Sequence, residues 1–168
     1  MLSHLWSPWR MQYIQTPRSN EGCIFCQALA EADDLTSLVV VRGQRAFVIL
    51  NRYPYTSGHV MVVPVDHQPS LEKLDPPSRA EIMELAARFI QVLEEVYHPQ
   101  GINVGINMGE AAGAGITDHV HMHIVPRWLG DTNFMSTLGK TRVLPEILED
   151  TYQRLKKGWE DLEAASFR

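Results

Sequence analysis

The sequence predicts an α+β fold with a mainly antiparallel sheet, one long inserted helix and a C-terminal helix. Short runs of β-branched and apolar residues come first and return later, and one long segment with helical periodicity lies between them. The chain has 168 residues, of which 45% are hydrophobic and 21% charged, so it is long enough to bury a core. We therefore expect a single domain over residues 1–168.

Three strands are predicted before the long helix. The run LVVVRGQRAFVILN (residues 38–51) is rich in β-branched residues and is interrupted at Gly43, which predicts two strands joined by a turn. The run VMVVPVDH (residues 60–67) is almost continuously apolar and predicts a strand buried on both faces. Upstream, CIFCQALAEADD (residues 23–34) predicts a knuckle that runs into a short helix.

The long helix is expected within residues 70–97. Pro76 and Pro77 suit a first helical turn, and His98 with Pro99 ends the helix. Its core face is formed by apolar residues at helical spacing, namely Ile82, Leu85, Ala86, Phe89, Val92, Leu93 and Val96.

The segments after the helix complete the sheet. GINVGINMG (residues 101–109) predicts a strand, and EAAGAGITD (residues 110–118) predicts a glycine-rich loop. HVHMHIVPRW (residues 119–128) predicts a final strand that is closed by Pro126, and residues 145–165 predict the C-terminal helix.

Charge and composition argue against several classes of function. A net charge of -5 disfavours long nucleic acid, which requires a basic surface. No apolar run approaches the roughly 18 residues of a membrane span. Residues 1–20 lack the apolar core of a secretory signal, so we expect a cytoplasmic protein. The aromatic side chains of this N-terminal arm require burial on their own domain or on a second subunit, and residues 129–168 form a C-terminal extension.

Three histidines alternate with apolar residues in the final predicted strand. Because side chains alternate faces along a strand, His119, His121 and His123 are expected on one face, with the apolar residues between them sealing the core. They could be plain surface histidines, a metal site, or a nucleophile at phosphorus with donors beside it. The glycine-rich loop directly before them favours the third, because its backbone N–H groups suit a phosphate cradle.

These motifs resemble the histidine triad (HIT) family. HVHMHIV matches the family's His-x-His-x-His pattern, AFVILNRYPYTSGHVMVVPVDH resembles its second signature, and NVGINMGEAAGAG lies where the family has its phosphate loop. The resemblance covers roughly residues 20–130. It implies a compact α+β domain, a homodimer with a continuous sheet, and a nucleotide in a cleft beside the triad strand.

The resemblance also implies roles for individual residues. His121 would attack the α-phosphorus and form a covalent nucleotidyl-histidine, His123 would donate to a phosphate or bridging oxygen, and His119 would support His121 through its backbone carbonyl. The remaining substrate contacts would come from Asn51 (ribose), Asn107 (phosphate), Gly113, Gly115 and Ile116 (loop), Ile24, Phe25 and Ile49 (base), and Trp128 (adenine side).

Two segments narrow the resemblance to one branch. PRWLGDTNFM after the triad and LWSPWRMQYI near the start resemble the bacterial diadenosine tetraphosphate phosphorylases, which use inorganic phosphate rather than water. Gly115 departs from the pattern, because hydrolases of the family have Gln there and related phosphorylases often have Ser. Phosphate is the acceptor we expect. The alternatives are a hydrolase of dinucleoside polyphosphates or nucleotide phosphoramidates, and a non-catalytic nucleotide-binding sensor.

The two cysteines provide half of a zinc site. Zinc usually has four ligands, so Cys23 and Cys26 need two more, for which His67 and His119 are the best candidates. A similar set occurs in zinc-bearing relatives of the family, and its role would be structural. Two reduced core cysteines without metal, or a redox pair, are the alternatives.

Four further residues have two interpretations each. His59 either orients a triad histidine or is a structural histidine. Asp118 is either solvated or tunes His119. Arg127, like Lys140, either helps to hold distal phosphates or belongs to the plain surface.

Overall fold

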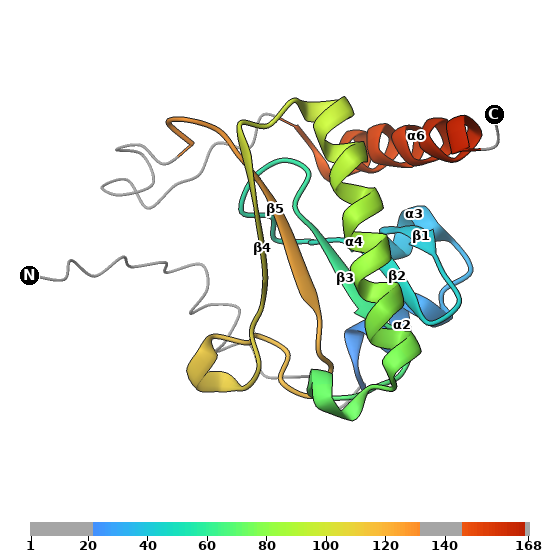
Figure 1. Cartoon of the computed structure of the whole chain (residues 1–168), viewed down its shortest axis with the longest axis vertical. Coiled ribbons are helices and arrows are strands. Elements are labelled where there is room, and N and C mark those ends of the chain that lie inside the picture. The colour runs from blue at the N-terminus through green and yellow to red at the C-terminus, as the bar shows by residue number, and fades with distance from the viewer. Residues whose placement is uncertain (1–21, 132–145, 167–168) are drawn as a thin grey trace, which may run out of the picture.

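The computed structural model describes residues 22–131 and 146–166. Within them, five strands form one antiparallel sheet in the order β1-β2-β3-β5-β4 (Figure 1). The strands are β1 (Val39–Arg42), β2 (Ala46–Leu50), β3 (Val60–Pro64), β4 (Gly101–Ile106) and β5 (Met122–Arg127). The α+β class with an antiparallel sheet is therefore confirmed. The N-terminal arm and Lys140 lie outside the described residues.

The helices are α2 (Ile24–Ala30), α3 (Asp34–Ser37), α4 (Pro76–Tyr97) and α6 (Leu148–Ser166), with short 3-10 turns at Leu71–Lys73 and Glu110–Ala112. The long helix α4 begins as predicted. The carboxylate of Asp75 caps it by accepting a hydrogen bond from the backbone N–H of Ser78 at 2.8 Å. It ends at Tyr97, because His98 adopts a left-handed conformation with φ 45°.

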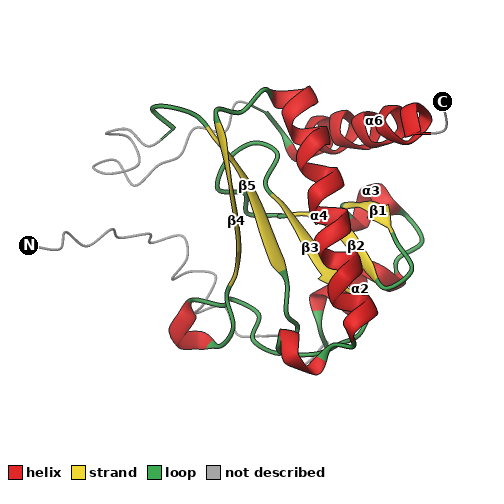
Figure 2. Cartoon of the chain, in the orientation of Figure 1, coloured by secondary structure: helices red, strands yellow, loops and turns green. Residues whose placement is uncertain are grey.

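The core lies between α4 and the sheet. α4 packs on β2, β3 and β5, as Figure 2 shows, and α6 packs on α4 and β1. The helix residues predicted for the core face are buried, apart from Val96, which is partly buried. No helix in the described part of the chain combines the length and apolar character that a membrane span requires.

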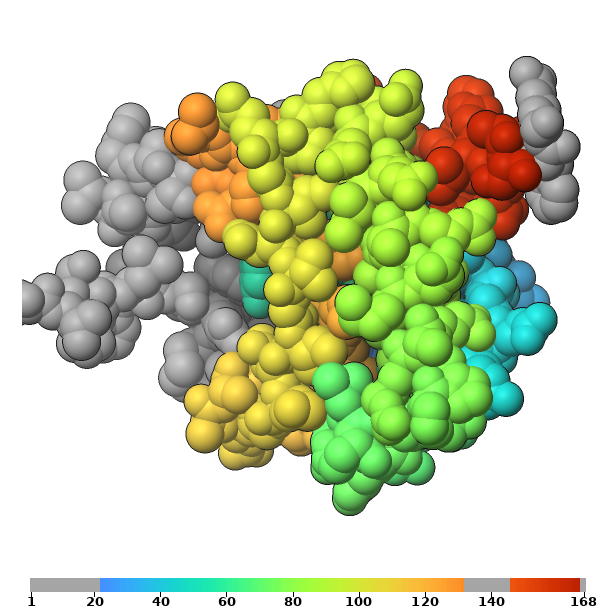
Figure 3. All heavy atoms as spheres, viewed as in Figure 1, coloured from blue at the N-terminus to red at the C-terminus, as the bar shows by residue number. Residues whose placement is uncertain are grey.

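The two edges of the sheet differ. β1 is flanked by α3 and α6, and the ammonium group of Lys156 donates to the Val40 carbonyl at 2.9 Å, so this edge is covered. β4 lies at the opposite edge, and most of its residues are exposed. In Figure 3, residues of β4 and α4 lie side by side on the face of the molecule toward the viewer.

The final strand is shorter than predicted. It begins at Met122, so His119 and His121 precede it and only His123 lies within it. The N–H of Val120 donates to the carbonyl of Gln68 at 2.7 Å, outside the sheet, because β3 has ended at Pro64. The alternation still holds in part: Val120, Met122 and Ile124 are buried in the core as expected, but His119 and His121 are also buried.

Candidate active site and metal centre

A cavity of about 520 Å³ lies over the central strands. Strand register explains part of its lining, because Ile49, Met61 and His123 pair side by side across β2, β3 and β5 and all line the cavity. The neighbouring side chains of Val48 and Val62 alternate to the other face and are fully buried in the core. The sheet therefore separates a packing face from a face that is available for binding.

Most of the predicted substrate-binding residues line this cavity, and these are Ile24, Phe25, Ile49, Asn51, Gly113, Gly115 and Ile116. His121 and His123 line it as well. The structure thus brings the predicted nucleophile and the predicted phosphate donor to the same cavity as the residues that would hold a base, a ribose and a phosphate.

A second cavity of about 290 Å³ adjoins the first and shares His123 with it. Asn107 lines this second cavity, together with Arg127 and Asp131. The guanidinium of Arg127 donates to the carboxylate of Asp131 at 2.6 and 2.8 Å, and also to the side chain of Asn103 at 2.8 Å. The second cavity is therefore more polar in character, with His123 at the boundary between the two. Trp128 follows β5 directly, is partly buried, and lines neither cavity.

His121 presents a nitrogen lone pair. Its Nδ1–H donates to the backbone carbonyl of His119 at 2.9 Å, which leaves the proton off Nε2. Burial lowers the pKa of His121 below its ordinary value, so the imidazole is neutral near pH 7. A neutral imidazole with an unprotonated Nε2 is a competent nucleophile.

His123 has the opposite arrangement, which is imposed by His59. The backbone N–H of Tyr55 donates to Nδ1 of His59 at 3.1 Å, so His59 must carry its proton on Nε2. That Nε2–H donates to Nδ1 of His123 at 3.0 Å. His123 therefore has its proton on Nε2, where it can act as a hydrogen-bond donor.

His59 is a functional candidate to which the sequence assigned two alternative roles. It is fully buried at the start of β3 and follows Gly58, whose φ is 77°. A side chain at Gly58 would also lie only 3.1 Å from Leu93 and Tyr97, so glycine is required there. The sequence drew attention to His59 through the Gly-His pair at the start of a buried strand. Its contact with His123 could not be predicted, because that contact depends on the pairing of β3 with β5.

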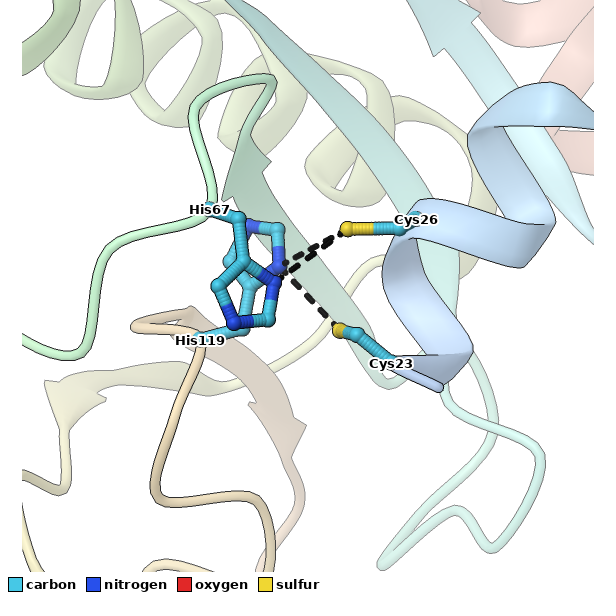
Figure 4. A group of neighbouring side chains, drawn as sticks. All are labelled: Cys23, Cys26, His67 and His119. Carbon is cyan, nitrogen blue, oxygen red and sulfur yellow. Dashed lines mark hydrogen bonds between the residues drawn. The ribbon is translucent and has the colours of Figure 1, made fainter. Parts of the chain in front are cut away.

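Four side chains that could bind a metal ion lie together (Figure 4). Cys23 and Cys26 come from the knuckle at the start of α2, His67 from the loop after β3, and His119 from the loop before β5. Their ligand atoms all lie within 4.8 Å of one another. The structure therefore brings together the four residues that were expected to form a metal site.

The geometry of this cluster fits a tetrahedral zinc ion. With zinc–ligand bonds of roughly 2.0 to 2.3 Å, adjacent ligand atoms lie roughly 3.3 to 3.8 Å apart. Nδ1 of His119 lies 3.3 Å from Sγ of Cys23 and 3.8 Å from Sγ of Cys26, and Nδ1 of His67 lies 3.3 Å from Sγ of Cys26.

A hydrogen bond outside the cluster fixes the orientation of His119, and an exposed carboxylate lies near His67. Nε2–H of His119 donates to the carbonyl of Pro64 at 2.9 Å, which leaves the lone pair on Nδ1 toward the cysteines. Asp118 is exposed, and its carboxylate lies 3.8 Å from Nε2 of His67. The side chain of Asp118 therefore reaches His67.

Known proteins resemble this chain in sequence. A sequence profile of the HIT domain matches residues 32–128. The chain is 39% identical over 165 residues to a Mycobacterium tuberculosis protein named AP-4-A phosphorylase, and the match covers 94% of this chain and 85% of that protein.

Solved structures show the same fold. A Zn-bound histidine triad family protein from Mycobacterium smegmatis matches with a TM-score of 0.70 and 26% identity, covering 88% of this chain and 99% of that one. A hypothetical histidine triad nucleotide-binding protein from Sulfolobus tokodaii matches with a TM-score of 0.68 and 25% identity, covering 84% of this chain and 94% of that one.

Proposed function

The chain belongs to the HIT domain family, and from that membership we propose that it is an enzyme that cleaves dinucleoside polyphosphates through a covalent nucleotidyl-His121. Diadenosine tetraphosphate is the substrate we favour, because the relative that matches 94% of the chain is named AP-4-A phosphorylase. Inorganic phosphate is the acceptor we favour for the same reason.

In the first half-reaction, the Nε2 lone pair of His121 attacks the α-phosphorus of one nucleoside. A P–N bond forms, the bond from that phosphorus to the bridging oxygen breaks, and ATP leaves with the electron pair. Nε2–H of His123 donates a hydrogen bond to an oxygen on which negative charge develops.

In the second half-reaction, an oxygen of inorganic phosphate attacks the same phosphorus. The P–N bond breaks, its electron pair returns to Nε2 of His121, and ADP leaves. Water in place of phosphate would give AMP. One site can therefore serve two acceptors in turn, because the covalent intermediate separates the two displacements.

The proposal depends above all on the hydrogen-bond partners of Nδ1 in His121 and in His123, which imply opposite protonation of the two Nε2 atoms that would act on phosphate. The carbonyl of His119 leaves Nε2 of His121 as a lone pair, and His59 leaves Nε2 of His123 as a donor. A nucleophile and a donor side by side at a cavity are what phosphoryl chemistry requires.

The two cavities suit the two ends of the substrate. The larger cavity is lined by apolar residues of α2 and β2, which can enclose an adenosine. The smaller cavity has Asn107 and Arg127 for the distal phosphates or the acceptor. Gly115 lines the larger cavity and provides no side-chain donor, so in that loop contacts to phosphate would come from backbone N–H groups.

We further propose that zinc binds to Cys23, Cys26, His67 and His119, since the donor set and spacing fit it. With four protein ligands it has no open position, so its contribution is structural. It would join the knuckle at the start of α2 to the loops that precede β5 and follow β3. A cytoplasmic location and a homodimer remain predictions from the sequence.

Product analysis tests the function. The protein is incubated with diadenosine tetraphosphate, with and without inorganic phosphate, and the nucleotides are separated by anion-exchange chromatography. ADP plus ATP that appear only with phosphate are expected. AMP plus ATP in both reactions would make the protein a hydrolase. No turnover, combined with retained nucleotide binding, would favour the non-catalytic sensor.

A further inference from the structure

The knuckle at residues 23–26 belongs to the metal cluster and to the cavity at once. Cys23 and Cys26 provide the two sulfur atoms of the cluster. The residues between them, Ile24 and Phe25, line the cavity that we assign to the nucleoside. Ile24 is 53% exposed, so its position depends on the backbone of the knuckle rather than on the core.

His119 connects the cluster to the cavity a second time. Its ring faces the two cysteines, and its backbone carbonyl holds Nδ1–H of His121 at 2.9 Å. A change in the position of His119 would therefore change the position of His121, and with it the direction of the Nε2 lone pair.

Phe25 forms a third connection. Its ring is 1% exposed and lies 5.4 Å from the ring of His119 and 5.0 Å from that of His121, centroid to centroid. One aromatic side chain thus packs against a candidate metal ligand and against the candidate nucleophile. The same side chain lines the cavity.

From these three connections we propose that metal binding at the cluster and nucleotide binding in the larger cavity are positively coupled. The inference depends on the proposed nucleotide site and on the fit of the cluster to zinc. Its physical basis is shared ordering: a metal that fixes residues 23–26 and His119 also fixes one wall of the cavity. The second ligand then has less conformational entropy to lose.

Coupling of this kind is reciprocal, because the factor by which the metal tightens nucleotide binding must equal the factor by which the nucleotide tightens metal binding. Coupling between two sites usually changes affinity roughly 5- to 150-fold. Since three contacts connect these sites directly, we expect an effect of about tenfold, within that range.

Competition for zinc provides the test. Zinc-loaded protein is equilibrated with increasing amounts of a colorimetric chelator of known zinc affinity, with and without saturating AMP, and the zinc Kd of the protein is obtained from the partition of the metal. AMP is expected to lower this Kd about tenfold. In parallel, calorimetry measures AMP binding to the zinc-loaded protein.

Two variants make the test specific. Phe25→Leu keeps all four metal ligands but removes the shared ring, so the effect of AMP on the zinc Kd should fall below about twofold. Met83→Ala alters an exposed side chain on α4 that lines neither cavity and is not part of the cluster, and should behave as the wild type.

The outcomes separate the two proposals. If AMP binds the loaded protein but leaves the zinc Kd unchanged, the coupling is overturned and the nucleotide site stands. If AMP does not bind at all, the proposed nucleotide site is overturned, and the coupling with it. An equal effect of AMP on the zinc Kd in wild type and Phe25→Leu would contradict the role assigned to this ring.

Discussion

His119 and His123 lie at the two ends of one alternating run, yet they are held in opposite ways. His119 is buried, its Nε2–H is bonded to the carbonyl of Pro64, and its lone pair faces the cysteines. His123 is partly exposed at the cavity, and its Nδ1 accepts a hydrogen bond from His59, so its proton is on the other nitrogen. We refer to these as the closed end and the open end of the triad.

The difference shows that the partner of one ring nitrogen decides what the other nitrogen can do. A carbonyl partner leaves a lone pair, which suits a metal at His119 and a phosphorus atom at His121. A donor partner leaves an N–H, which suits a phosphate oxygen at His123. On the proposed function, three identical side chains would have three chemical roles because their surroundings differ.

The largest effect is expected at His121, which lies between the two ends. His121→Ala removes the proposed nucleophile, so turnover of diadenosine tetraphosphate should fall at least roughly 10⁴-fold. AMP binding, measured by calorimetry, should change little, because the rest of the cavity remains. Turnover within tenfold of wild type would rule out the covalent route through this residue.

Metal removal should distinguish the closed end from the open end. If free zinc exceeds its Kd a thousandfold, binding contributes about 4 kcal/mol to folding. For a domain of this size that corresponds to roughly 8 to 16 °C in Tm. Chelation should therefore lower the wild-type Tm by this amount in a thermal melt.

Two variants provide the matched comparison for that melt, one in the metal cluster beside the closed end and one at the open end. His67→Ala loses a metal ligand, so chelation should no longer change its Tm strongly. His123→Ala should keep the full dependence of Tm on metal and yet lose turnover. A metal dependence that is lost equally in both variants would contradict the division of the triad into two ends.

Replacing His59 should reduce turnover through His123 and leave the metal cluster at the closed end unchanged. His59→Leu removes the donor that fixes the proton of His123, so kcat should fall about 10²-fold while KM changes little. His59→Gln retains an N–H donor and should recover part of the loss. Steady-state kinetics checks both, and an unchanged zinc content confirms that the closed end is intact. Equal kcat values for the two variants would mean that only the packing of His59 matters.

The smallest effect is expected far from both ends, at the cap of α4. Hydrogen bonds from Ser78 hold the pKa of Asp75 below its ordinary value of 3.8, so the charged carboxylate stabilises the folded state. This contribution is present above pH 3.8 and is lost as the pH falls through the lower, folded-state pKa. Asp75→Ala should lower Tm by a few degrees at pH 7, and the difference from wild type should close in acid.

Variants of this cap serve as a control for the other tests, because losing the cap destabilises the fold without changing a residue at either end of the triad. Asp75→Asn keeps a side-chain oxygen for the cap and should show a smaller loss at pH 7. In thermal melts, both variants should retain the wild-type response to chelation. A reduced response would show that general destabilisation can mimic the loss of a metal ligand.

Periodicity predicted much of the fold. The β-branched runs and the helical spacing within residues 76–97 identify elements from local sequence alone, because each pattern reflects which side chains face the core. The start of the last strand could not be predicted in this way. Its apolar alternation continues back to Val120, but the hydrogen bond of that residue goes to Gln68 instead of a strand.

The candidate site was predictable where chemistry limits the choice of residues. Two cysteines require partners, and His67 and His119 were available to complete the set. The role of His59 could not be decided, because His59 meets His123 across 64 residues of sequence, through pairing that only the fold creates. The position of Asn107 in a separate, second cavity was likewise not visible in the sequence.

The covered edge of the sheet has a consequence for stoichiometry. In the predicted homodimer with a continuous sheet, β4 is the edge that remains open for joining, because α3, α6 and the ammonium group of Lys156 cover β1. Two copies joined at β4 would present only covered β1 edges to the outside. The assembly would then end at a closed pair with twofold symmetry and would have no edge from which to grow into a fibre.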